Sequence, residues 1–141
     1  MNWTFESLET PELICVVCSG LFTSADFATM FDELLVLPYW HKLVPIFLDQ
    51  KNLEVAETSW KELMDASDTF IRHNSNFAYT KISILFGSQE SYETGLRFAA
   101  ITKQGTKALV RMFRDEQKAL DWVAPEAKQF AQTAGRGPRI H

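Results

Sequence analysis

Short apolar runs alternate with segments of helical periodicity along this chain of 141 residues. Four runs are rich in β-branched and aromatic residues and have the length of strands that are buried on both faces of a sheet. These runs span residues 13–18, 44–49, 79–87 and 107–113. A less apolar segment at residues 4–7 is expected to form a short edge strand.

Each of the four runs is followed by a pattern that predicts an amphipathic helix. Polar residues suited to N-capping stand at the expected helix starts: Thr23 or Ser24, Ser59, Ser88 and Asp115. Ser59 and Glu62 have the spacing of a capping box. Pro38 and Gly105 are expected to end the first and third helices. The buried stripe of the second helix is predicted to contain Trp60, Leu63, Met64, Phe70 and Ile71.

Four strand–helix units in series predict an α/β fold with a mainly parallel sheet and right-handed crossovers. No linker or low-complexity segment interrupts the pattern, so residues 1–134 are expected to form a single domain. The fourth helix is expected to break or restart at Pro125 and to continue to about Thr133. The glycine-rich end at residues 135–141 is predicted to be a flexible tail.

Composition and charge exclude several functional classes. A formal net charge of -4 without a basic cluster gives no reason to expect nucleic-acid binding. The apolar runs are shorter than the roughly 20 residues that a spanning helix needs, so no stable membrane insertion is expected. The N-terminal stretch lacks the pattern of a secretory signal, which favours a cytoplasmic protein. No metal or cofactor motif is present, and none is expected to be bound.

The two cysteines, Cys15 and Cys18, form a C-x-x-C spacing inside the first long apolar run. Residues three apart in a strand point to opposite faces of the sheet, because side chains alternate with a period of two. The two thiols are therefore not expected to form a disulfide or to share a metal ion. We predict that both are buried and inert, since free cysteine behaves as a small apolar residue.

Candidate ligand-binding residues lie where the predicted parallel strands end. Ligands of open α/β sheets usually bind at the carboxyl edge of the strands. Turn formation and helix capping explain the same residues without any ligand. The candidates are Gly20, Asp49, Gly87, Ser88 and Arg114.

The segment ALVRMFRDEQKALDWV, residues 108–123, carries a recognisable pattern. It resembles the C-terminal signature of the SpoIIAA-like bacterial family, in which a strand with an aromatic residue is followed by an acidic cap and a helix. The corresponding residues are Phe113, Asp115, Ala119, Leu120, Trp122 and Val123. The stretches VVCSGLFTSADF, PIFLD and KISILFG resemble earlier strands of that family.

The resemblance implies the fold of STAS domains, which are anti-sigma-factor antagonists and are related to the CRAL-TRIO lipid-binding fold. It implies a β-α superhelix of four to five strands, with helices mostly on one side and an antiparallel first strand at the edge. True antagonists carry a phosphorylatable serine directly after the Asp that ends the second strand. Here that place is taken by Gln50, in LDQKNLEV, so no phosphorylation is expected.

Two functions stay open at this point. The first is a non-catalytic binding module that docks a protein partner or holds a small apolar ligand, since the chain shows no catalytic motif and is rich in aromatic residues. The second is a small enzyme that uses a polar cluster of Asp49, Arg114 and His41. Unpaired sheet edges also make a homodimer a possible state.

Overall fold

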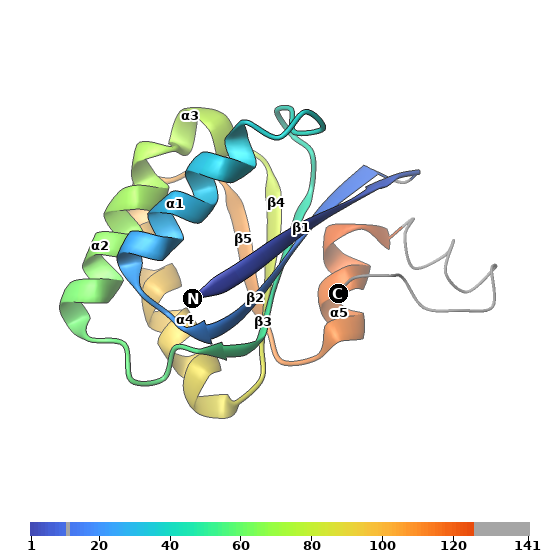
Figure 1. The fold of residues 1–141 in the computed structure, drawn as a ribbon. Helices are drawn as coiled ribbons and strands as arrows, with labels where there is room; N and C mark the ends of the chain where they lie inside the picture. Colours follow the sequence, from blue (N-terminus) through green and yellow to red (C-terminus); the bar gives the residue numbers. More distant parts are fainter. Residues whose placement is uncertain (11, 126–141) are drawn as a thin grey trace.

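The computed structural model describes residues 1–10 and 12–125, which form one five-stranded sheet and the helices around it (Figure 1). The strands lie in the order of the sequence. They are β1 (Asn2–Glu9), β2 (Glu12–Leu21), β3 (Ile46–Glu54), β4 (Lys81–Phe86) and β5 (Leu109–Phe113). β1 is antiparallel to β2, and every other pair is parallel. The mainly parallel sheet and its antiparallel first edge strand are confirmed.

The helices cover the two faces of the sheet unequally. The elements are α1 (Ser24–Leu35), α2 (Trp60–Arg72), the short α3 (Asn74–Phe77), α4 (Gln89–Thr102), the 3₁₀ turn η1 (Lys103–Gly105) and α5 (Glu116–Val123). Figure 1 shows α1, α2 and α4 on one side of the sheet and α5 on the other. The prediction of helices mostly on one side is confirmed, and α3 is an element that the sequence pattern did not indicate.

β2 shows how the sheet separates two apolar cores. Ile14, Val16 and Cys18 belong to the larger core, which includes the buried residues of α1 and α2. Leu13 and Cys15 belong to the smaller core under α5. A strand in contact with both cores must be apolar at successive positions, which explains the unbroken run in the sequence.

The two cysteines lie on opposite faces of β2, as the alternation of side chains predicts. Cys15 is in the core under α5, whereas Cys18 Sγ lies 3.7 Å from Met30 Sδ in the larger core. Both are free and buried. Burial raises the pKa of the Cys18 thiol to about 12. Burial, followed by the negative charge of Glu6, also raises the pKa of Cys15 strongly.

The predicted helix caps are present. A side-chain oxygen of each capping residue accepts a hydrogen bond from the backbone N–H three residues later, at 2.9 to 3.1 Å, and so satisfies one of the free N–H groups of a helix start. The capping residues are Thr23, Ser59, Ser88 and Asp115.

Glu62 departs from the predicted capping box. Its carboxylate accepts a hydrogen bond from the backbone N–H of Ser24. The box is therefore half formed: Ser59 caps α2, while Glu62 links the first turn of α2 to the start of α1.

The buried stripe predicted for α2 is wrong at two positions. Trp60 is 60% exposed and Met64 is 38% exposed. The buried side of α2 instead includes Leu63, Ala66 and Phe70. Trp60 is the first residue of the helix, one turn before Leu63, so it has no preceding turn to pack beside it.

Several expectations concern parts of the chain outside the described residues. The continuation of the last helix to Thr133 and the tail at residues 135–141 belong to this group, because the description ends at Pro125. Within the described ranges, no helix is long and apolar enough to cross a membrane.

Candidate functional site

Asp49 does not end its strand, and this prediction is wrong. β3 continues to Glu54, and Asp49 pairs in register with Val17 of β2 and Leu85 of β4. Its side chain is almost fully buried, with 1% exposure. The polar residues after Leu48 resemble a strand end, but they continue the strand because β2 also continues beside them.

The carboxylate of Asp49 is used for an internal ion pair. Lys51 Nζ lies 2.7 Å from Asp49 Oδ2, and the backbone N–H of Lys51 donates to Asp49 Oδ1 at 3.2 Å. Lys51 Nζ also lies 3.2 Å from Glu116 Oε1 of α5. Burial opposes the charge of Lys51, yet its hydrogen bonds and charge interactions with Asp49 and Glu116 raise its pKa on balance. This network ties α5 to β3.

The two candidate glycines have structural explanations. Gly20 has a φ of +90°, a backbone conformation that residues other than glycine rarely adopt. A Cβ atom at Gly87 would lie 2.1 Å from the backbone oxygen of Lys51, so only glycine allows this close approach. Each position therefore requires glycine whether or not a ligand binds.

The remaining candidates, Ser88 and Arg114, also have partners. Ser88 caps α4. Arg114 is exposed and its Nη1 donates to Gln89 Oε1 at 3.0 Å. Of the five candidates, Gly87 and Ser88 line a surface hollow of about 440 Å³ together with residues of β3, whereas Gly20, Asp49 and Arg114 do not line it.

The polar cluster proposed for an enzyme is not assembled. His41 lies in the connection before β3, where its Nε2 is 2.6 Å from Glu12 Oε2 at the start of β2. The Glu12 hydrogen bond raises the pKa of His41. His41, Asp49 and Arg114 thus contact three separate sets of residues, so the structure gives no shared site for them.

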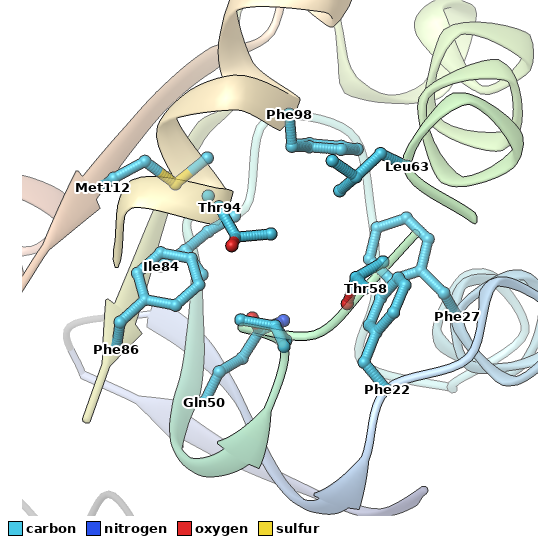
Figure 2. A pocket seen from close by; sticks show the side chains of 12 residues that line it. Phe22, Phe27, Gln50, Thr58, Leu63, Ile84, Phe86, Thr94, Phe98 and Met112 are labelled. Atoms are coloured by element: carbon cyan, nitrogen blue, oxygen red, sulfur yellow. The ribbon is translucent and has the colours of Figure 1, made fainter. Parts of the chain in front are cut away.

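An apolar pocket lies elsewhere, between helices α1, α2 and α4 and the face of the sheet that carries the larger core. Figure 2 shows its side chains arranged around a central space. The empty space is about 390 Å³ including the open mouth, and its enclosed part is about 40 Å³. The lining residues are Phe22, Phe27, Gln50, Val55, Thr58, Leu63, Ile84, Phe86, Thr94, Gly95, Phe98 and Met112.

Two adjoining sides of this pocket are formed by an aromatic cluster. The rings of Phe22 and Phe27 are 5.6 Å apart, and Phe27 meets Phe98 edge to face at 5.9 Å. Such contacts hold large side chains in fixed orientations. Figure 2 shows Phe98 and Gln50 on opposite sides of the space, with Phe22 and Phe27 along a third.

Three polar side chains line the pocket, and they differ in their hydrogen bonding. Thr94 Oγ1 lies 3.2 Å from the Glu90 carbonyl oxygen and accepts from Arg97 Nη2 at 3.0 Å. Gln50 is only 4% exposed, yet its side-chain amide forms no hydrogen bond within the described part of the chain. The half-buried hydroxyl of Thr58 has no such bond there either.

The sequence pattern drew attention to Gln50 without indicating a role for it, and it did not indicate that the other lining residues form a pocket. The sequence identified Gln50 only as the replacement for a phosphorylatable serine. Ligand crevices at the carboxyl edge of α/β sheets form where the strand order reverses. Here the order never reverses, so the pocket forms between the sheet and the helices instead. Leu53, an apolar residue three positions after Gln50, was the available signal that β3 continues.

Comparisons with known proteins support the fold. No protein-family model and no curated protein matches this chain. A crystal structure of an uncharacterised protein of the DUF3478 family from Shewanella loihica PV-4, described as having a SpoIIAA-like fold, superposes with a TM-score of 0.57. The match covers 87% of this chain and 93% of that chain at 16% sequence identity.

The chain has a SpoIIAA-like fold. This confirms the fold that the sequence resemblance implied. At 16% identity the likeness concerns the fold alone, so function has to be argued from the pocket and its side chains.

Proposed function

We propose that this protein is a non-catalytic binding module that holds a small, largely apolar ligand in the pocket between the sheet and helices α1, α2 and α4. The observation that carries the proposal is the pocket itself, which has a mostly aromatic and aliphatic lining with a few polar groups. This composition is typical of small-molecule sites.

The absence of reactive groups from the lining supports binding rather than catalysis. None of the twelve lining residues is an acid, a base, a cysteine or a histidine. General acid–base catalysis requires a titratable group within hydrogen-bonding reach of the substrate. The threonine hydroxyls at Thr58 and Thr94 have no histidine or carboxylate beside them in this lining that could activate them.

The size of the pocket limits the ligand. A cavity that encloses a benzene ring has a volume of about 150 Å³. The enclosed part of this pocket, about 40 Å³, holds only a group of about the size of a methyl or a hydroxyl, so most of a ring or aliphatic chain would lie in the open mouth.

The test is a thermal-shift screen with small aromatic and branched aliphatic compounds, applied to the wild type and to two variants. Thr58 is half-buried in the loop between β3 and α2, so Thr58→Trp fills the pocket without cutting into the core. Thr4→Trp makes the same change on an exposed position of β1, away from the pocket.

A true pocket ligand stabilises the wild type and Thr4→Trp but not Thr58→Trp. At a ligand concentration about 100-fold above Kd, the expected rise in Tm is about 5–10 °C. Equal shifts in all three proteins, or no shift with any compound, would contradict the proposal.

Docking of a protein partner is the second candidate, with a second copy of this chain as the partner. Leu43 and Tyr79 are 60% and 63% exposed. Each lies three residues before a register pair of adjacent strands, Ile46 and Ile82, so both stand near the amino-terminal ends of two inner strands of the sheet. Light scattering of the wild type and Leu43→Ser tests for a homodimer through this surface.

A cytoplasmic location is likewise proposed, and cell fractionation is its test.

A further inference from the structure

Gln50 and Thr58 are two polar side chains in the mostly apolar lining of the pocket that have no hydrogen bond within the described residues. Gln50 is nine-tenths buried or more, and Figure 2 shows its amide directed into the central space. The amide atoms of Gln50 are not among the fully buried unpaired atoms of the described residues, so they keep some access to solvent through the open pocket. They are therefore available to a ligand that enters the pocket, which would replace that solvent.

Two polar side chains near Gln50 are paired, whereas the buried hydroxyls of Thr80 and Ser83 elsewhere in the described chain have no hydrogen bond. Asp49, the residue before Gln50, is paired with Lys51 on the opposite face of the sheet. Thr94, in the same pocket as Gln50, is bonded to the Glu90 carbonyl and to Arg97. Gln50 and Thr58 are the two lining polar side chains without such a bond within the described residues.

The surroundings restrict the charge of the ligand. No lysine, arginine, aspartate or glutamate lines the pocket. A charged group in this lining would lose part of its hydration, and the nearby guanidinium of Arg97 already donates a hydrogen bond to the lining residue Thr94. The glutamine amide offers one acceptor and two N–H donors, and a threonine hydroxyl can act as either. Together they complement a neutral group that both donates and accepts.

We propose that Gln50, assisted by Thr58, makes the pocket selective for small neutral molecules that carry one hydroxyl or amide group on an apolar body. This inference rests on the proposed ligand-binding function and adds the chemical class of the ligand. Gln50 is its specificity-determining residue, and the aromatic cluster of Phe22, Phe27 and Phe98 holds the apolar body.

The experiment compares phenol with toluene, which have almost the same shape but differ in one hydroxyl group, and with benzoate, which is charged. Affinities are measured by NMR titration of the wild type, Gln50→Met and Thr58→Val. Methionine nearly matches glutamine in volume. The quantity of interest is the ratio of phenol to toluene affinity, because the hydration of the free compounds cancels when this ratio is compared between proteins.

The ratio is expected to fall about tenfold in Q50M, which corresponds to the loss of one buried hydrogen bond. A smaller fall is expected in T58V, and benzoate is expected to bind none of the proteins. If Q50M does not fold, Gln50→Leu takes its place.

Different results would overturn the selectivity inference and the proposed ligand-binding function. If phenol and toluene both bind the wild-type pocket and the ratio is unchanged in Q50M, the selectivity inference is overturned while ligand binding stands. Benzoate binding as tight as that of phenol would also overturn it. If neither phenol nor toluene perturbs the resonances of pocket residues, ligand binding by this pocket fails as well.

Discussion

Asp49 and Lys51 lie on the same face of β3, with Lys51 Nζ 2.7 Å from Asp49 Oδ2. Between them, Gln50 points to the opposite face and lines the apolar pocket. Two consecutive buried polar residues thus serve different ends: Asp49 joins an ion pair that fastens α5, and Gln50 faces the proposed ligand site.

Replacing Asp49 should destabilise the protein. Asp49→Asn removes a buried carboxylate that accepts two hydrogen bonds, one of them from a charged lysine. The expected loss is about 1–3 kcal/mol in the free energy of unfolding, measured by urea denaturation. Asp68→Asn is the control, because Asp68 is exposed and should change stability by less than about 0.5 kcal/mol. Equal effects of the two variants would show that the Asp49–Lys51 pair adds nothing.

His41 should titrate at a higher pH than an ordinary histidine. Its hydrogen bond with Glu12 raises its pKa above the usual value of about 6.5. A raised folded-state pKa means that the stabilising contribution of this contact is fully present below the unfolded-state pKa and is lost as pH rises through the folded-state pKa. An NMR titration should show the elevated pKa in the wild type and a lower pKa in Glu12→Gln. The same pKa in both proteins would rule out Glu12 as the cause.

Gly95 should be required for the position of the Phe86 ring. A Cβ atom at Gly95 would lie 2.3 Å from Phe86 Cζ, which is too close for any real contact. Gly95→Ala should therefore destabilise the protein by about 1–3 kcal/mol through overpacking, although alanine favours helices by about 1 kcal/mol over glycine.

A second substitution distinguishes this crowding from other effects. Phe86→Leu removes the ring and leaves room for the new methyl group. The double variant G95A/F86L should then be no less stable in urea than F86L alone. If alanine at position 95 destabilises both backgrounds equally, the contact with Phe86 is not the reason for the glycine.

The two thiols should be unreactive in the folded protein. Both are buried, and burial raises the pKa of Cys18 to about 12. At pH 8 almost no thiolate exists, so a thiol-specific reagent such as Ellman's reagent should label neither cysteine until denaturant is added. Rapid labelling of native protein, or a disulfide between Cys15 and Cys18 in mass spectrometry, would contradict the placement of these residues on opposite faces of β2.

The sequence was informative about the strands, the helix caps and the cysteines because these features depend on local spacing. Period-two alternation placed Cys15 and Cys18 on opposite faces, and the residues at 23, 59, 88 and 115 cap their helices as expected. Spacing could not reveal that Glu62 binds Ser24, because that contact joins two helices far apart in the chain.

The candidate site was harder to predict because it also depends on contacts between segments that lie far apart in the chain. Asp49 follows an apolar run and precedes polar residues, which is also the pattern of a strand end. The strand continues because β2 extends beside it as far as Leu21, and one segment does not reveal the length of its neighbour. The pocket around Gln50 is built from residues of β3, β4 and β5 and of α1, α2 and α4, so no single motif marks it.

The most direct test of the central claim is a crystal structure of the protein with phenol bound. The account predicts phenol between Phe98 and Gln50, with its hydroxyl within hydrogen-bonding distance of the Gln50 amide. Phenol bound only in the surface hollow beside Gly87 and Ser88, or the Gln50 amide turned away from a ligand in the pocket, would contradict it.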